Sequence, residues 1–503
     1  MQIIFLLIPA ICMSSATQED YTEALRKALT SSVSRTDLLD KIRSIHEKAY
    51  ANGDPIVYPK GKKFRIEIPH DFKPIKLTAN TDFNGCTFSV RNTYAKVFLF
   101  EMKPNTAPQA ISIDKQQLTS GMKIETKGKS PKLLIVKDNN LWTLRYDFDN
   151  QGDITNIKQE CFRRDLFFVE NNIIKNNPIS TYDNDASAPT CQYIEIDTRQ
   201  KTFSNLKLIR EKSSTAVTNL IRIEYQYNIL LNNINVQTYL QKDEDKRFYY
   251  DQCLYIENCA NVSMSNITVR NTYSAQSIWG YAVEMNNVLD CTFDRLSITA
   301  IRGGFNTTCA NNLLFKDCHL NRADIHYYGR DLTCIGCTFE NTLNSFHVYN
   351  RVSSFFGTLK YEKCVFNHFI PVRIDSEYNS FTSFNVEMND CTLNIYHQPP
   401  LTYNCICHIP ILESLENTRA ELRRKNLPNI KVNNLKLEGP SSLKDFYFFI
   451  VHKNKYTGNV YGMDSLQING LTYNAGNNTS LTLNDFSLPV QTAKPYKRII
   501  TGF

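Results

Sequence analysis

The fold is decided between residues 313 and 393, where the sequence reads LLFKDCHL from Leu313, LTCIGCTF from Leu332, LKYEKCVF from Leu359 and VEMNDCTL from Val386. Each copy has two alternating apolar residues, a two-residue gap and two more alternating apolar residues. Alternation with a period of two is typical of a strand with one buried face. Because the gap recurs at the same place, each copy predicts two short strands joined at a fixed corner.

The same quartet recurs on both sides of this stretch. Its nine copies begin at Ile229, Val262, Cys291, Leu313, Leu332, Leu359, Val386, Ile430 and Leu466, and the last residues of successive copies are 19 to 44 residues apart. Strands that turn and stack on the previous turn, with loops of unequal length at the corners, describe a parallel β-helix. Leucine-rich repeats need a leucine-dominated motif and a tighter period, so they are disfavoured.

Cysteines hold a fixed place in this repeat. The third position of the quartet is occupied by Cys318, Cys337, Cys364 and Cys391. This placement predicts an inward stack of small apolar thiols rather than disulfides or a metal site. The chain has 15 cysteines, an odd number. Cys405 and Cys407 lie outside the repeat and are the pair to test for bonding or reactivity.

The composition is that of an ordered, β-rich protein. The 503 residues are 42% hydrophobic and include 27 Tyr and 29 Phe but only 18 Gly and 18 Pro, which excludes disordered, collagen-like and coiled-coil classes. The formal charge of +7 is too small to indicate a nucleic-acid partner but suits a polyanionic substrate. An apolar run from Ile3 to Ile11 before Ser14-Ser15-Ala16 resembles a cleavable signal peptide. We therefore expect a secreted or periplasmic protein with no membrane span.

The expected organisation has five parts. They are a signal peptide (1–16), an N-terminal helical cap with the first strands (17–94), an inserted β-rich segment (95–190), a β-helix of about ten coils (191–490) with a long loop at 395–429 that includes the helical run Leu412–Lys425, and a C-terminal tail (491–503). The quartets, together with Val57–Gly61 and Asp82–Phe88, resemble the pectin-lyase-like superfamily over about residues 50–94 and 190–490. The resemblance implies an all-β, right-handed parallel β-helix. It leaves the reaction open, because this scaffold hosts lyases, hydrolases, esterases and phage tailspikes.

A third strand precedes each quartet and predicts which residues face outward. One predicted column is Glu195, Arg222, Tyr255, Ala282, Asn306, His326, His347 and Arg373, and its neighbour is Asp197, Glu224, Glu257, Glu284, Thr308, Tyr328, Tyr349 and Asp375. Stacked strands lie about 4.8 Å apart and residues two apart on a strand about 6.6 Å apart. Polar groups of adjacent coils would then contact one sugar unit. For any single member, a solvated sheet face is the alternative interpretation.

This inventory predicts eliminative cleavage of a uronate polysaccharide. Arg373 and Asn306 would neutralise the carboxylate, and His326 or His347, with an unperturbed pKa of about 6.5, would remove the adjacent proton. Tyr328 or Tyr349 would protonate the departing oxygen. Further substrate contacts are expected from Arg302, Arg322, Arg330, Trp279, Tyr255, Glu257 and Glu284. The expected partner is an acidic polysaccharide, with a glycosaminoglycan favoured over pectin because of the arginines, and the protein is expected to be a monomer.

Two other functions stay open. Glu224, Glu257 and Glu284 on successive coils suit glycoside hydrolysis, because coils about 4.8 Å apart approach the roughly 5 Å carboxylate separation of retaining enzymes, while alternate coils near 9.6 Å reach the inverting limit. With Asp197, the same ladder would suit Ca²⁺, the one cofactor that the sequence allows. The third hypothesis is a non-catalytic glycan-binding β-helix, which needs aromatic and hydrogen-bonding groups but no base.

Overall fold

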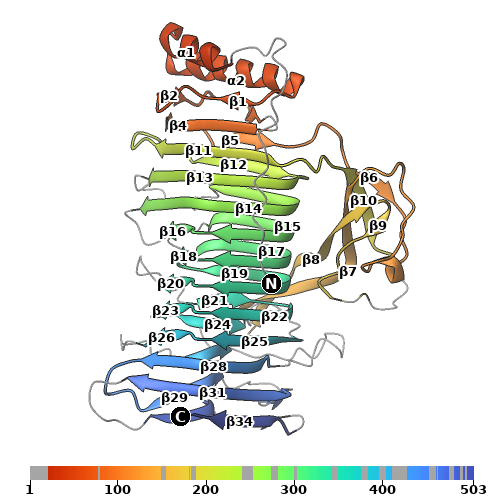
Figure 1. The fold of residues 1–503 in the computed structure, drawn as a ribbon, viewed down its shortest axis with the longest axis vertical. Coiled ribbons are helices and arrows are strands. Elements are labelled where there is room, and N and C mark those ends of the chain that lie inside the picture. The colour runs from red at the N-terminus through yellow and green to blue at the C-terminus, as the bar shows by residue number, and fades with distance from the viewer. Residues whose placement is uncertain are drawn as a thin grey trace, which may run out of the picture.

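The computed structural model of the chain describes residues 21–77, 80–148, 154–180, 182, 188–240, 253–273, 281–299, 303–340, 349–374, 383–395, 404–409, 427–451, 460–461, 463–474, 481–487, 491–492 and 495–502. Parallel strands stack along the long axis of the molecule, two helices lie at its N-terminal end, and a smaller antiparallel sheet lies at one side (Figure 1). Neither helix is long and apolar enough to cross a membrane. The predicted signal peptide lies outside the described residues.

The N-terminal helices are α1 (Tyr21–Ser31) and α2 (Arg35–Asn52). The side chain of Ser34 caps the start of α2, and Gly53 ends the helix with a left-handed φ of 71°. The buried side chains of Leu25, Leu39 and Ile42 belong to the same hydrophobic core as the first strands of the stack. The two helices therefore cover the N-terminal end of this core.

The stack consists of short strands that pair in parallel. Before the antiparallel sheet these are β1 (Ile56–Val57), β2 (Lys63–Glu67), β3 (Ile75–Lys76), β4 (Asn80–Arg91) and β5 (Val97–Met102). After it come β11 (Lys201–Arg210), β12 (Thr218–Glu224), β13 (Tyr227–Leu240), β14 (Leu254–Tyr273), β15 (Tyr281–Asp294), β16 (Ser297–Thr299), β17 (Gly303–Lys316), β18 (His319–Leu320), β19 (Ala323–Ile335), β20 (Thr338–Glu340), β21 (Tyr349–Val352), β22 (Phe355–Glu362), β23 (Val365–Asn367), β24 (Ile370–Ile374), β25 (Ser383–Asn389), β26 (Thr392–Asn394), β27 (Cys405–Ile409), β28 (Asn429–Glu438), β29 (Asp445–Val451), β31 (Ser465–Asn474), β32 (Thr482–Phe486) and β34 (Lys497–Thr501). A separate parallel pair is formed by β30 (Val460–Tyr461) and β33 (Gln491–Thr492).

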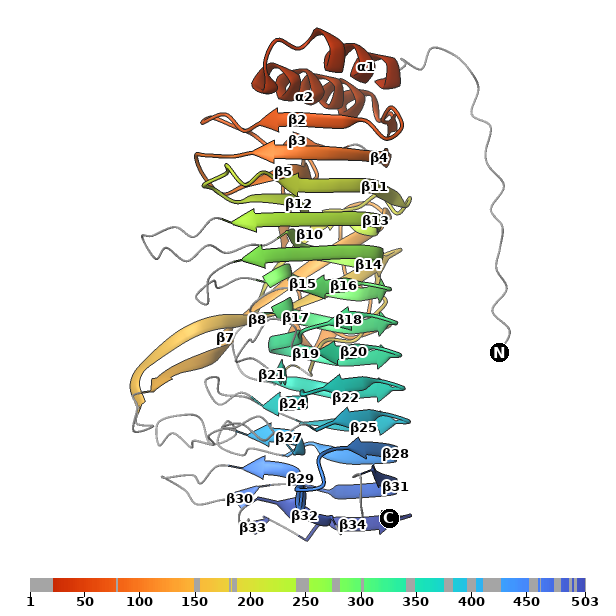
Figure 2. The ribbon, with the colours of Figure 1, turned by 90° about the vertical axis from the view of Figure 1, so that its left-hand side faces the viewer.

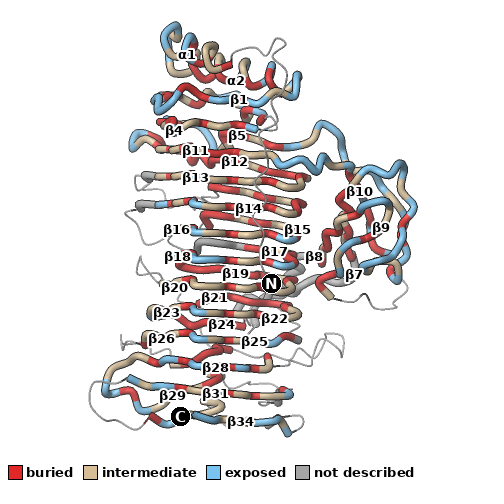
Figure 3. Tube along the Cα trace, viewed as in Figure 1, coloured by how far each residue is buried: buried red, intermediate tan, exposed pale blue. Residues whose placement is uncertain are grey.

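The predicted quartets stand in register along the stack. Ile229 pairs with Val262, and Leu313 pairs with Leu332, which in turn pairs with Leu359. Buried residues recur on the strands along the stack (Figure 3), and their side chains form one hydrophobic core. Five copies form two strands joined at a corner, as predicted, whereas the copies at Ile229, Val262, Ile430 and Leu466 each lie within one longer strand, β13, β14, β28 or β31.

The corner itself has a backbone cause. The second residue of every gap has a positive φ of 50° to 76°, and these residues are Asn233, Asn266, Arg295, Asp317, Gly336, Lys363, Asp390, Asn434 and Gly470. A residue in the left-handed region turns the chain sharply, and Asn, Asp and Gly tolerate this conformation best. The gap therefore bends each long strand from one face of the stack to the next.

The cysteines of the quartet are buried, free thiols in the core, as predicted. Cys405 and Cys407 are also buried, free thiols, and burial raises the pKa of both, which opposes reactivity. Both belong to β27, which lies inside the region predicted as a loop at 395–429. This strand pairs with β24 and β29. The helical run predicted within that loop lies outside the described residues.

The antiparallel sheet is inserted between β5 and β11, and we call residues 109–195 the side module. Its strands are β6 (Gln109–Ile111), β7 (Lys132–Phe148), β8 (Ile154–Glu170), β9 (Ile173–Ile174) and β10 (Thr190–Glu195), with a short 3-10 helix at Lys115–Gln117. β7 and β8 form a long hairpin that extends beside the stack (Figure 2). The predicted insertion at 95–190 begins too early, because β5 pairs in the stack with β3 and β12.

Candidate functional site

One face of the stack carries polar side chains on its outer surface. It contains β12, the first parts of β14, β15, β17 and β19, and then β21, β24 and β27. Core residues flank most of the outward positions, as Val372 and Ile374 flank Arg373. Strand register joins the outward positions into a column, which we call the outer stripe: Arg222, Tyr255, Glu284, Asn306, Asp324, Arg351, Arg373 and His408.

The outer stripe corrects the predicted column. Tyr255 pairs with Glu284, whereas the column predicted from the sequence places it next to Ala282. This error is a slip of two residues, which leaves every side chain on its own face of the sheet and so does not disturb the hydrophobic pattern. The predicted pairing of Glu257 with Glu284 is wrong for the same reason.

A bulge in β19 causes the second error. Thr307 pairs with Ile325 and Thr308 pairs with Tyr327, so His326 is an extra residue without a register partner in β17. A bulge re-aims the side chain that it contains. His326 is therefore not in the column predicted for it, although it keeps a place beside the outer stripe with 7% of its surface exposed.

Ionic and phenolic groups surround this histidine. Asp324 is 1% exposed. Its carboxylate oxygen Oδ2 forms an ion pair with Arg322 Nε at 2.5 Å and lies 3.6 Å from His326 Nε2. Its other oxygen accepts the backbone N–H of Arg351 at 2.8 Å. The hydroxyl oxygen of Tyr281 lies 2.9 Å from His326 Nε2 and 3.4 Å from Asp324 Oδ2.

Aromatic contacts extend this group to the next coil. The ring of Tyr349 has the guanidinium carbon of Arg322 at 4.9 Å and that of Arg373 at 4.2 Å from its centroid, which are favourable cation–π distances. Arg373 in turn pairs with His408 on the following strand. We call the whole set the Arg–His cluster: Tyr281, Arg322, Asp324, His326, Tyr349, Arg351 and Arg373.

The electrostatics of the Arg–His cluster define a cationic site with a neutral imidazole. Burial lowers the pKa of His326 to about 4, against the raising effect of Asp324, so the ring is uncharged at neutral pH. Burial alone would raise the pKa of Asp324, but the charge of Arg322 and the hydrogen bond with His326 hold it well below its usual value. The charges of Arg322 and Arg351 thus act on one buried carboxylate, that of Asp324.

A second polar group lies nearer the N-terminal end of the outer stripe. Glu224 and Glu257 are register partners, and Glu257 accepts hydrogen bonds from Tyr255 at 2.9 Å and from Arg164 of the side module at 3.2 Å. Burial, and then the charge of Glu257, raises the pKa of Glu284, while Lys96 lowers it. The two carboxyl groups of Glu257 and Glu284 therefore sit in different environments.

The remaining predicted residues lie elsewhere or outside the described residues. Tyr328 is buried against Ile179 and Cys309 at the side module rather than on the outer stripe. Arg330 donates to the backbone oxygen of Ile179 at 3.3 Å and pairs with Asp331. His347, Arg302 and Trp279 lie outside the described residues, as does the side chain of Asn306, whose backbone lies on the outer stripe.

The predicted calcium ladder has basic partners in place. Asp197 pairs with Arg199, and Glu224 pairs with Arg222 and Lys103. Within the described ranges, no group of three or more His, Cys, Asp or Glu side chains is arranged to hold a metal ion.

Sequence reasoning missed several members of the site. Asp324, Arg351 and His408 each precede a core residue in a strand that the quartets do not mark, as in Ala323-Asp324-Ile325 and Cys407-His408-Ile409. That short alternation is the signal that could have found them. Tyr281 carries no such signal, because it has the same strand parity as the core residues Val283 and Met285.

The fold has known structural neighbours. The structure is similar to the tailspike protein gp49 from Pseudomonas phage LKA1, with a TM-score of 0.60 and 12% identity over 92% of this chain and 74% of that chain. It is also similar to the gp54 tailspike of Acinetobacter baumannii bacteriophage AP22, solved in complex with A. baumannii capsular saccharide, with a TM-score of 0.53 and 12% identity over 95% of this chain and 76% of that chain.

No protein-family model and no curated protein matches the sequence. At 12% identity, similarity to the tailspikes establishes architecture and leaves chemistry to the site. The parallel register of the stack and this similarity agree with the sequence pattern. The protein has a parallel β-helix fold.

Proposed function

We propose that the protein acts on a polysaccharide at the Arg–His cluster and that it cleaves a uronate-containing chain by β-elimination. The observation that carries this proposal is the neutral imidazole of His326, which is nearly buried, 2.9 Å from the Tyr281 hydroxyl and beside the arginines of the Arg–His cluster. The tailspike of phage AP22, which has the same architecture, was solved with a capsular saccharide. This supports a glycan as the substrate class.

The proposed chemistry uses the described contacts. Arg373 and Arg351 bind the uronate carboxylate and stabilise the charge that develops on it when the neighbouring carbon loses its proton. His326 accepts that proton, the electron pair forms the carbon–carbon double bond, and the bond to the glycosidic oxygen breaks. Tyr281 protonates the departing oxygen and recovers a proton from His326 Nε2, 2.9 Å away. The proton count therefore closes within the Tyr281–His326 pair.

The test is an assay of purified protein on a panel of acidic and neutral polysaccharides, following the ultraviolet absorbance of the unsaturated product. We expect His326→Gln to lower the rate about 10²- to 10⁴-fold, the range for loss of a general base. His319→Gln is the matched control, because His319 is half exposed on β18 and pairs with Glu340. Cleavage unchanged in His326→Gln would contradict the assignment.

Hydrolysis is the second candidate, and one observation favours it. The pKa of Glu284 is raised, whereas the carboxylate of Glu257 accepts hydrogen bonds from Arg164 and Tyr255. Two carboxyl groups in different environments are the usual acid and base of a glycosidase. New reducing ends without ultraviolet absorbance, lost in Glu284→Gln but kept in His326→Gln, would establish this alternative. Binding without either product would leave a glycan-binding protein.

Further proposals concern substrate and setting. The arginines of the cluster favour a sulfated glycosaminoglycan over pectin, because guanidinium groups bind sulfate and carboxylate alike. We also propose a right-handed helix of about ten coils whose N-terminal helices act as a cap, and an exported protein that works as a monomer. Sedimentation of the mature chain tests the last point.

A further inference from the structure

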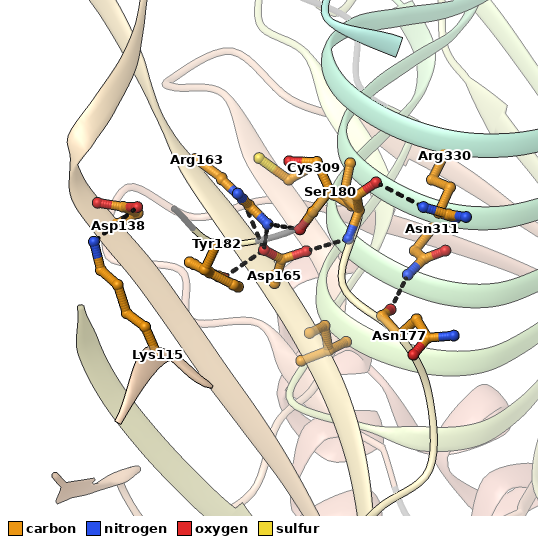
Figure 4. Close-up of polar contacts among 12 residues, drawn as sticks. Lys115, Asp138, Arg163, Asp165, Asn177, Ser180, Tyr182, Cys309, Asn311 and Arg330 are labelled. Atoms are coloured by element: carbon orange, nitrogen blue, oxygen red, sulfur yellow. Dashed lines mark hydrogen bonds and ion pairs between the residues drawn. The ribbon is translucent and has the colours of Figure 1, made fainter. Parts of the chain in front are cut away.

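The side module contains a buried polar network next to the segment that contacts the stack (Figure 4). Asp165, which is 1% exposed, accepts from Arg163 Nε and Nη2 at 2.9 Å each and from the Tyr182 hydroxyl at 2.5 Å, all on Oδ2. Its Oδ1 accepts the backbone N–H of Ile179 at 2.7 Å. The Arg163 guanidinium also lies 3.9 Å from the centre of the Tyr182 ring. One carboxylate thus fixes the shape of the segment that follows β9.

This segment contacts two strands of the stack. The backbone oxygen of Ile179 accepts from Arg330 of β19 at 3.3 Å, and that of Asn177 accepts from Asn311 of β17 at 2.8 Å (Figure 4). The side chain of Ile179, 1% exposed, packs in one cluster with Tyr328. The side module therefore contacts β17 and β19, the two strands whose pairing contains the bulge.

The contacts fall next to the bulge itself. Tyr328 follows His326 by two residues, and Cys309, in the same cluster as Ile179, follows Thr307 by two. Tyr328 and Cys309 have positive φ values of 54° and 55°. A tyrosine in this region costs about 1–3 kcal/mol and persists only where its surroundings hold it. The same angle recurs at the equivalent corner of other coils, at Tyr225, Asn258 and Asn287, so it belongs to the stack, and the packing of Ile179 adds to what holds it at Tyr328.

We propose that Ile179 is a positioning residue of the candidate site: by packing on Tyr328, it holds the bulge that aims His326 at Asp324 and Tyr281. The side module then sets the geometry of the Arg–His cluster from outside the stack. The kinetic consequence rests on the proposed function, whereas the structural one does not. Displacing a reacting group by about 1 Å costs on the order of 10²-fold in rate.

The kinetic test compares two cavity-forming variants of the same module. Ile179→Ala removes the contact with Tyr328, whereas Ile174→Ala opens a cavity in the module's own core, where Ile174 is fully buried beside Phe167. We expect Ile179→Ala to lower kcat about tenfold or more with KM within about twofold. Ile174→Ala should leave both values near those of the wild type, and Ile179→Val should restore most of kcat.

The second readout needs no activity. Proton titration of the His326 ring, followed by NMR and assigned by comparison with His326→Gln, reports its position among Asp324, Arg322, Arg351 and Tyr281. Ile179→Ala should raise the pKa of His326 toward the ordinary value by about one unit or more as the bulge loosens and the ring gains solvent. Ile174→Ala should not change it.

The outcomes separate the two proposals. A shifted His326 titration in a protein that cleaves no glycan would support the positioning role and refute the enzymatic function. An unchanged titration in folded Ile179→Ala would overturn the positioning role. If that variant does not fold, Tyr182→Phe, which loses only the hydroxyl bond to Asp165, should show a smaller shift in the same direction, and no shift there would also overturn it.

Discussion

At the scale of single residues, two glycines with the same backbone angle have different surroundings. Gly357 and Gly85 both have a φ of 74°. A Cβ on Gly357 would lie 2.0 Å from Asp331 Oδ1, an oxygen that accepts the backbone N–H of Thr358 at 2.8 Å, whereas nothing lies within 4 Å of a Cβ on Gly85. The neighbour of Gly357 can therefore move only by losing a hydrogen bond.

This pair gives a stability prediction. Gly85→Ala should lower the free energy of unfolding by about 1 kcal/mol, the cost of a left-handed alanine. Gly357→Ala should lower it by about 2–3 kcal/mol, because the displaced hydrogen bond is added. Urea unfolding measures both free energies. Equal losses would show that the Asp331 side chain moves aside without a loss of stability.

Buried and exposed ion pairs should also respond differently. Asp324→Asn leaves the buried Arg322 charge without its carboxylate, so we expect a loss of about 3 kcal/mol. Asp197→Asn breaks a pair with the exposed Arg199 and should change stability little. Denaturant midpoints measure the difference, and similar midpoints for the two variants would contradict this account.

At the scale of strands, the sequence determined two faces of the stack and not the third. The quartets carry a left-handed corner residue, such as Asn233 or Asp317, at a fixed place, so both strand parity and register could be read. The strands with the outer stripe also end at residues with a positive φ, but these vary in type, as Tyr225, Asn287 and Cys309 do, so their sequence carries no recognisable marker of register. Alternation reveals which face a residue joins but not a slip of two, which displaced Glu284. A one-residue bulge reverses the face of the residues after it, so Tyr328 is buried at the side module rather than on the outer stripe.

The residues of the candidate site were predicted only in part. Arg322, Arg373, Tyr349 and His326 were named from sequence, and the structure brings them together. Their partner Asp324 was missed because it precedes a bulge.

Strand β27 allows a further prediction. Cys405 and Cys407 are fully buried and burial raises the pKa of each thiol, so neither should react with a thiol reagent until the protein unfolds. Peptide mass spectrometry after labelling measures this. Val33→Cys, at a position 94% exposed, is the positive control. Rapid labelling of either cysteine in native protein would contradict the packing of β27.

At the scale of the whole molecule, two buried histidines link stability to pH. Burial lowers the pKa of His46 to about 3 and that of His326 to about 4. In the unfolded chain the pKa of both rings is about 6.5, so between about pH 4 and about pH 6.5 the unfolded chain binds more protons than the folded protein. Their stabilising contribution is complete above pH 6.5 and falls below it, by up to about 1.4 kcal/mol per pH unit for each ring.

Urea unfolding between pH 7 and pH 5 tests this dependence, because the paired carboxylates titrate at lower pH. We expect the free energy of unfolding to fall across this interval and the fall to be smaller in His46→Gln. His319→Gln, on the surface, should keep the wild-type slope. A stability that is flat over this interval would contradict the buried, neutral state of both rings.

The insertion of the side module has a consequence for synthesis of the chain. β4 pairs directly with β11, and β5 with β12, across the whole module. A ribosome that has released residues up to 195 has therefore exposed an edge of unpaired backbone donors and acceptors that must wait for about 30 more residues to emerge. Such an edge recruits other nascent chains until it is paired. The β7–β8 hairpin, once closed, draws the two ends of the insertion together and so shortens the search of β11 for β4 after β11 has emerged.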